Sequence, residues 1–422
     1  MKPLSTPPAC AAGHDKTASG RTSSMARLAA GVFAASVAIA STAQESPGDG
    51  VYKDRIDWGV IMDMSGPTSA SQGIWVNGFQ DHMRKVNDAG GVNGRKINVL
   101  AEDSRYNPAQ DRIAYEKVVG QTPVLGISGM GNSSSQVSLA PTIKGGKVPV
   151  VGTYTSTKAL FDPVSPMVYG GFCGYNQMAQ TGVGYFTEKL KLKAPKVMTV
   201  SIETAGGKEY AEMVAAAAAK LGGSATTVTM KISAADVTPQ VLEIIAQKPD
   251  FITIYGISNT SILTMRTMQQ YGLNIPAFGI SYLGAPQIFT SVGPQAGANY
   301  FFVSCFTPGG ADDRPGNKDL MAAAAKYNHA AMAEDINYVA GWVAAQMAAE
   351  SIARLGNEPT RAKLVESMNK GFTVDSRGLA APITFTKDDH TGPVVLKTFG
   401  YDYATKKFRA YGEYNDYLKY VK

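Results

Sequence analysis

The order of apolar segments constrains the fold of this chain more than any other feature. From residue 56 onward, short apolar runs alternate with amphipathic stretches of helical length. Residues 56–62 form the first such run, and residues 74–89 follow with apolar side chains at helical spacing until Gly90 and Gly91 end the pattern. This alternation predicts an α/β fold, in which helices cover a mostly parallel sheet.

Further units continue this pattern to about Gly279, and a length of 422 residues allows two or three domains or two interleaved lobes. Asn107 and Pro108 predict the start of a helix that runs to residue 119. The last long helix is expected at 338–355, and the chain from residue 383 alternates like antiparallel strands. The remaining predicted strands are 96–100, 124–127, 148–151, 197–201 and 251–255, and the remaining predicted helices are 208–221 and 239–247.

The first 43 residues are typical of a signal peptide. Arg27 supplies the positive region, residues 28–40 the apolar region, and Ala43 ends a run of small residues, with cleavage after Ala40 as the competing position. The 24 residues before Met25 are polar and unpatterned, which favours synthesis from Met25. We therefore expect a secreted, periplasmic protein. Beyond residue 43 no apolar run is long enough for a transmembrane helix, so we expect no membrane insertion of the mature chain.

The charge and the metal-binding residue types exclude several classes of protein. Without residues 1–43 the formal net charge falls from +6 to +3, which is too small a surplus for a nucleic-acid-binding surface. His82, His329 and His390 show no metal-ligand spacing, so we expect no metal and no cofactor. Motifs of hydrolases, metalloproteases and redox enzymes are absent, and Asp63, Glu102 and Asp103 are more typical of solvated turns, so we expect no catalytic residue and no enzyme.

Two polar loops follow predicted strands, at residues 129–135 and 153–157. The first opens a helix, whose unpaired N–H groups suit a carboxylate or phosphate, although Ser134 stands where a dinucleotide-binding motif needs glycine. Each loop alone is explained as well by helix capping. Together they favour a ligand site, because both would border the same crevice at the carboxyl ends of the strands.

Three motifs resemble the leucine/isoleucine/valine-binding family, the extracytoplasmic solute receptors of ABC importers. They are Met64-Ser65-Gly66-Pro67, the run Ala89-Gly90-Gly91-Val92-Asn93-Gly94-Arg95-Lys96, and Glu102-Asp103 followed by Asn107-Pro108. The resemblance covers nearly all of the mature chain. It implies a type I periplasmic-binding fold of two lobes, each a mostly parallel sheet flanked by helices, joined by three hinge crossovers.

The crossovers implied by the resemblance fall near Cys173, Cys305 and Gly378. Lobe 1 would comprise residues 54–173 and 306–378, and lobe 2 residues 174–305 and 379–422. Because the family places the two cysteines on neighbouring crossover strands, a disulfide is implied, with two buried free thiols as the alternative.

The resemblance also implies which residues bind the ligand. Lobe 1 would hold a carboxylate and an amino group, and lobe 2 would present neutral and aromatic groups. Amino-acid binders of this family have an acidic partner for the ligand ammonium where this chain has Ser281, and aromatic residues where it has Ala205 and Ser258; Glu203 or Asp63 could replace the acid if the loops are rearranged. The expected ligand-binding residues are Gln72, Trp75, Asn132, Ser133, Tyr154, Thr155, Ser156, Tyr175, Ser258, Ser281 and Tyr282.

These features favour a monomeric receptor that delivers a small carboxylate to the permease subunits of an ABC importer. The ligand is either of the amino-acid type or an aromatic or other organic acid. Two alternatives stay open, a sensory protein that presents its ligand to a membrane receptor and a secreted α/β enzyme.

Overall fold

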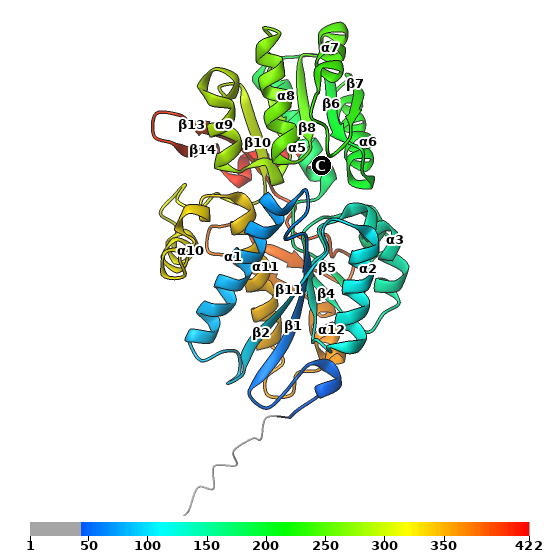
Figure 1. Cartoon of the computed structure of the whole chain (residues 1–422), viewed down its shortest axis with the longest axis vertical. Coiled ribbons are helices and arrows are strands. Elements are labelled where there is room, and N and C mark those ends of the chain that lie inside the picture. The colour runs from blue at the N-terminus through cyan, green and yellow to red at the C-terminus, as the bar shows by residue number, and fades with distance from the viewer. Residues whose placement is uncertain (1–43, 422) are drawn as a thin grey trace, which may run out of the picture. The chain divides into compact units, whose positions relative to one another are not determined.

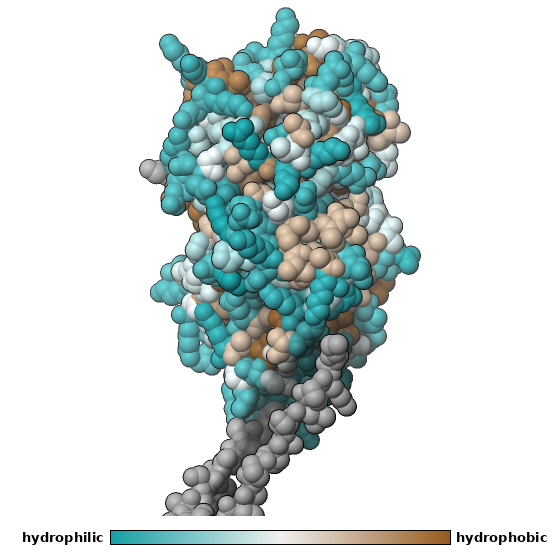
Figure 2. All heavy atoms as spheres, turned by 90° about the vertical axis from the view of Figure 1, so that its left-hand side faces the viewer, coloured by the Kyte–Doolittle hydropathy of each residue, from teal (hydrophilic) through white to brown (hydrophobic). Residues whose placement is uncertain are grey.

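The computed structural model describes residues 44–421. The predicted signal peptide, both cleavage positions and the start at Met25 lie outside the described residues. Among the described helices, none has both the length and the apolar character needed to cross a membrane. Figure 2 shows one face of the molecule, on which hydrophilic side chains predominate.

The first sheet has five strands in the order β2-β1-β3-β4-β5, and all of its pairings are parallel. Strand β1, which lies between β2 and β3, is buried along almost its whole length, as the apolar run at 56–62 predicts. Helices α1 and α11 lie on one side of this sheet and α2 and α3 on the other (Figure 1). The strands are β1 (Arg55–Met62), β2 (Lys96–Asp103), β3 (Ile127–Gly129), β4 (Val150–Thr153) and β5 (Val168–Gly170); the helices are α1 (Ser69–Asp88), α2 (Pro108–Glu116), α3 (Ser133–Lys144), α4 (Lys158–Phe161), α10 (Pro315–Lys326), α11 (Ile336–Ala353) and α12 (Arg361–Asn369).

Two glycines allow α1 and α11 to pack directly on each other. A Cβ on Gly78 would lie 2.0 Å from the carbonyl oxygen of Tyr338, and one on Gly341 would lie 2.0 Å from that of Trp75. Any larger residue would push the helices apart. This contact holds α11, which comes late in the sequence, against the first unit of the fold.

The second sheet is mixed, with seven strands in the order β14-β13-β10-β9-β8-β6-β7. Strands β6 to β10 pair in parallel, whereas β13 pairs antiparallel with both β10 and β14, which confirms the predicted antiparallel end of the chain. Its strands are β6 (Lys196–Ile202), β7 (Ser224–Met230), β8 (Phe251–Tyr255), β9 (Ala277–Gly279), β10 (Tyr300–Ser304), β13 (Lys397–Asp402) and β14 (Lys407–Tyr411); its helices are α5 (Tyr175–Lys189), α6 (Ala205–Lys220), α7 (Thr238–Gln247), α8 (Ser258–Gln270) and α9 (Pro286–Gly297).

We call the first sheet with its helices lobe 1 and the second with its helices lobe 2. The predicted residue limits of the lobes stay a prediction, but the structure favours a later third crossover than Gly378. Strand β12 (Ile383–Phe385) pairs with β11 (Phe372–Val374), and the backbone N–H of Gly170 in β5 donates to the carbonyl of His390. Because these contacts keep residues up to His390 on lobe 1, we propose a crossover at 393–396, just before β13.

Arg95, in one of the motifs that carry the resemblance, is buried, and no carboxylate of residues 44–421 pairs with it. Its Nε, Nη1 and Nη2 donate to the carbonyl oxygens of Tyr52, Asn357 and Gln44, at 2.8, 3.2 and 2.7 Å. Hydrogen bonds of this kind are stronger than neutral ones because the donor is charged. Arg95 therefore holds the segment 44–52, which precedes β1, against lobe 1.

Candidate functional site

Loops that follow the strands of both sheets meet around a small cavity of about 30 Å³. We call it the central cavity. Lobe 1 contributes the loops after β1, β2, β3 and β4, and lobe 2 the ends of β6 and β8 and the turn after β9. Its lining residues are Thr68, Ser71, Gln72, Tyr106, Gly131, Tyr154 and Thr155 from lobe 1 and Ile202, Tyr255, Gly256, Ile257 and Tyr282 from lobe 2.

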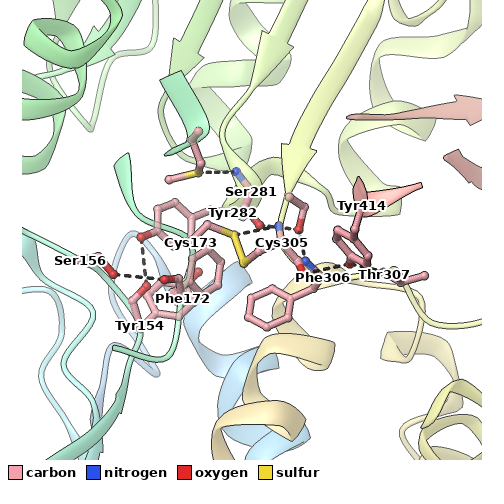
Figure 3. The surroundings of a disulfide bond; sticks show 12 residues. Tyr154, Ser156, Phe172, Cys173, Ser281, Tyr282, Cys305, Phe306, Thr307 and Tyr414 are labelled. Atoms are coloured by element: carbon pink, nitrogen blue, oxygen red, sulfur yellow. Dashed lines mark hydrogen bonds between the residues drawn. A yellow bond between two sulfur atoms is a disulfide. The ribbon is translucent and has the colours of Figure 1, made fainter. Parts of the chain in front are cut away.

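Tyr154 and Tyr282 tie the two lobes together at this cavity. Their ring centroids lie 4.8 Å apart, and the Tyr282 hydroxyl donates to the carbonyl of Tyr154 at 3.0 Å (Figure 3). Asn337, near the start of α11, accepts from the Tyr154 hydroxyl at 2.7 Å and donates to the carbonyl of Tyr282 at 3.1 Å. Burial raises the pKa of both tyrosines well above the usual value, so their hydroxyls stay protonated donors.

The start of α3 lies at the same junction. The Asn132 side chain caps the helix, because its Oδ1 accepts from the N–H groups of Ser134 and Ser135. Ser133 Oγ accepts from the backbone N–H of Gly206 in lobe 2 at 3.0 Å. A serine hydroxyl can accept and donate at once, and the hydroxyls of Tyr106 and Tyr255 also interact with that of Ser133.

A buried carboxylate, Asp111, stands behind this helix start. It accepts from Ser135 Oγ at 2.6 Å, and burial raises its pKa from 3.8 to about 6. Asp111 thus occupies the inner side of the α3 start and leaves the outer side, with Ser133, to face lobe 2.

The structure brings together only part of the predicted site. Gln72, Tyr154, Thr155 and Tyr282 line the central cavity, and Trp75 packs edge-on against Tyr154 behind it. Ser281 is buried but donates to Ser304 Oγ at 2.8 Å, and Ser258 begins α8 next to Ile257, so neither lines the cavity.

Ser156 and Tyr175 lie at a second and larger interlobe pocket of about 350 Å³, which we call the side pocket. Ser156 Oγ donates to the carbonyl of Phe172 at 3.3 Å (Figure 3), and the Tyr175 hydroxyl lies 2.9 Å from that of Tyr255. Tyr175 and Tyr255 therefore lie between the side pocket and the central cavity.

Neither acid proposed from the sequence as an ammonium partner faces the central cavity. Asp63 is fully buried and accepts from the N–H groups of Gly66 and Thr68 and from the Thr68 hydroxyl, so it shapes the turn after β1. Glu203 is exposed and borders a different hollow, along α6 and β7.

Tyr106 and Tyr255 line the cavity but were not among the predicted residues. Tyr255 is the last residue of a predicted strand, where a side chain can point into the crevice; that position is the one signal that could have identified it. Tyr106 has a positive φ of 53°, a backbone conformation that is uncommon for tyrosine, and its polar surroundings in the sequence give no indication of it.

Cys173 and Cys305 form a disulfide beside the cavity (Figure 3), with their Cα atoms 5.6 Å apart. The bond lies among Phe172, Tyr282 and Phe306, whose rings pack on one another. It joins the end of the first lobe 1 segment to the residue that follows β10, and thus links two of the three predicted crossovers.

No group of three or more histidine, cysteine, aspartate or glutamate side chains in the described residues could hold a metal ion. The central cavity is lined by hydroxyls, the Gln72 amide, backbone groups, isoleucine side chains and aromatic rings. Such groups bind and orient a ligand.

Asp335, which positions Asn337, should make stability depend on pH. Its Oδ1 accepts from the N–H and the side-chain amide of Asn337, and burial raises its pKa from 3.8 to about 7. The folded protein then binds a proton that the unfolded chain has lost, so this group lowers the free energy of unfolding as pH rises from about 4 to 7. We expect Asp335→Asn to flatten this slope in urea titrations between these pH values; an unchanged slope would contradict the assignment.

The family model and the similar solved structures all concern binding proteins of the same kind. A family model of periplasmic binding proteins matches residues 56–396. The structure is similar to a fatty acid ABC transporter substrate-binding protein from Thermomonospora curvata, with a TM-score of 0.77 and 21% identity over 90% of this chain and 97% of that one. It is also similar to a branched-chain amino acid ABC transporter protein from Thermus thermophilus with bound valine, with a TM-score of 0.76 and 20% identity over 85% and 95%. A leucine-binding protein from Thermotoga maritima gives a TM-score of 0.73 and 20% identity over 85% and 98%. A search of curated protein sequences gives no match.

Proposed function

The chain belongs to the periplasmic binding protein family, and on that premise we propose that it is the solute receptor of an ABC importer. It captures a small carboxylate-bearing ligand between its lobes in the periplasm and, as a monomer, presents the closed form to the permease subunits. The ligand leaves chemically unchanged, and its binding energy favours lobe closure.

The observation that carries this proposal is the junction of the two lobes. Loops from both sheets supply a helix start and a set of hydroxyls that touch across it, including Ser133 with Gly206 and Tyr154 with Tyr282. Contacts of this kind can form only when the lobes are together, so a ligand that adds bonds to both sides would stabilise closure.

Two arguments support a carboxylate. At the α3 start, where Asn132 already accepts from the N–H groups of Ser134 and Ser135, the hydroxyl of Ser133 lies with those of Tyr106 and Tyr255, and hydroxyl donors suit an anion. The fatty acid, valine and leucine in the names of the similar structures all carry a carboxyl group. Lobe 2 contributes Tyr175, Tyr255 and Tyr282 to the two interlobe spaces, which suits an aromatic or other organic acid at least as well as a branched-chain amino acid.

A thermal-shift screen of amino acids, aromatic acids, dicarboxylates and amides tests the proposal. A ligand at 100 times its dissociation constant stabilises by about 2.7 kcal/mol, which shifts the melting temperature measurably. Mass spectrometry of the ligand after incubation should show no turnover. If only uncharged compounds stabilise the protein, the carboxylate assignment is wrong; if the ligand is converted, the receptor assignment is wrong.

Gly206→Ala should weaken binding of any ligand found in this screen. A Cβ at this position would lie 2.1 Å from the Tyr255 hydroxyl, 2.6 Å from the Tyr175 hydroxyl and 3.0 Å from Cβ of Ser133. Overpacking of this kind costs roughly 1 to 3 kcal/mol, which corresponds to a roughly 5- to 150-fold rise in Kd by calorimetry. Gly73→Ala in α1 is the control, because a Cβ there meets nothing within 4 Å. Equal affinities for both variants would show that binding does not require this contact.

A further inference from the structure

The side pocket is built by both lobes next to the disulfide-linked crossovers. Phe161, Tyr175 and Met213 give it apolar and aromatic walls, and Ser156, in the loop after β4, also lines it. It is about ten times larger than the central cavity, at 350 Å³ against 30 Å³. The pocket can therefore hold a part of a ligand that the central cavity cannot.

The charges that line this pocket do not cancel. Lys158 and Asp162 pair with each other across one helical turn at 3.3 Å. Glu209, on α6, is half-buried and attracted by the charge of Lys158, but no cationic side chain among the described residues forms an ion pair with it. Its Oε1 accepts from the backbone N–H of Lys158 at 2.8 Å, and burial raises its pKa, so the ionised form lacks full solvation.

We propose that the side pocket binds a positively charged nitrogen of the ligand, with Glu209 as its carboxylate partner. This inference rests on the proposed function, since it assumes a ligand held between the lobes. The nitrogen carries N–H groups that donate to Glu209 Oε2, which accepts no described hydrogen bond. The aromatic rings of Phe161 and Tyr175, which also line the pocket, suit a cation as well.

The position of Glu209 sets the distance between the two ends of the ligand. Gly206, whose N–H reaches Ser133 at the α3 start, precedes Glu209 by three residues, so the two positions lie on one face of α6 about one turn apart. A carboxylate near Ser133 and a cation at Glu209 would therefore lie about one helical turn, roughly 5 Å, apart along α6, whereas an α-amino acid carries both charges on one carbon atom. The ligand class that fits both is a carboxylic acid with an amine at the far end of a short chain.

Calorimetry with matched probes tests this pairing. We expect the wild-type protein to bind 5-aminovalerate tighter than valerate by roughly tenfold to a hundredfold, the range for a hydrogen bond to a charged group. Glu209→Gln keeps an acceptor for the Lys158 N–H but removes the charge, and should reduce the ratio to near one. Glu212→Gln is the matched control, because it changes the same charge on an exposed residue of the same helix.

Each result separates this inference from the proposed function. A ratio that Glu209→Gln leaves unchanged, a preference for valerate, or no binding of any amine at millimolar concentration would overturn the inference. If valerate binds and the amine adds nothing, carboxylate capture stands without a cation site. If 5-amino-1-pentanol binds as tightly as 5-aminovalerate and only through Glu209, the cation site stands and the carboxylate assignment fails.

Discussion

Replacing Cys173 and Cys305 together with alanine should lower the free energy of unfolding by about 5 kcal/mol. The disulfide closes a loop with a sequence separation of 132 residues, and in the chain-entropy account a loop of this length restricts the unfolded chain strongly. Urea denaturation of the double variant against the wild type measures the difference, and the wild type with a reductant should approach the variant.

The control for this prediction is the number of thiols. Protein purified from the periplasm should show no free thiol under denaturing, non-reducing conditions. Two free thiols would refute the disulfide in the native protein. If the free energy of unfolding falls by less than about 1 kcal/mol in the double variant, other contacts hold the linked crossovers in place.

Ser133→Ala combined with Ser156→Ala should weaken carboxylate binding by roughly 3 to 4 kcal/mol, counting about 1.5 to 2 for each hydrogen bond lost to a charged group. Ser133 is the first residue of α3, and Ser156 lies in the loop after β4, where its hydroxyl donates to the carbonyl of Phe172. Both hydroxyls belong to the lobe that we expect to bind the anion. Titration calorimetry with a ligand from the screen gives the affinity of each variant.

Replacing Tyr282 provides the comparison for the serine variant, because it should change which ligands are preferred instead of removing carboxylate binding. Wild-type affinity in the double serine variant would show that lobe 1 does not read the carboxylate. Tight binding of valine or leucine by the wild type would show that this chain accepts an α-amino acid without the acidic residue that amino-acid binders of the family have at the position of Ser281.

The sequence was sufficient to predict the parallel core because buried strands are continuous apolar runs. Strands β1, β6 and β8 lie where these runs predict them. The edge strand β7 escaped prediction because it is mostly exposed and rich in threonine, and therefore lacks the apolar run. Strand β3 begins at Ile127, where the predicted strand ends, since the earlier apolar residues of that run are buried in the approach to the sheet.

The candidate site was less predictable, because its residues are set by how loops from distant segments meet. Ser281 was aligned to a binding position, yet its hydroxyl turns toward Ser304. The sequence does not indicate a binding role for Glu209, because a glutamate on an alanine-rich helix is usually a solvated side chain. Only the approach of α6 to the loop before α4 makes it part of an interlobe pocket.

The Cys173–Cys305 bond also determines how the molecule bears force. Every strand of lobe 2 from β6 to β10 lies inside the loop that the bond closes, whereas β13 and β14 lie outside it. Tension applied to the two ends of the chain passes through the sulfur atoms and bypasses that loop. The oxidised protein, when stretched, would thus be shorter than the fully extended chain by roughly 450 Å, at about 3.4 Å for each residue inside the loop. A reductant that cleaves the disulfide would restore this length.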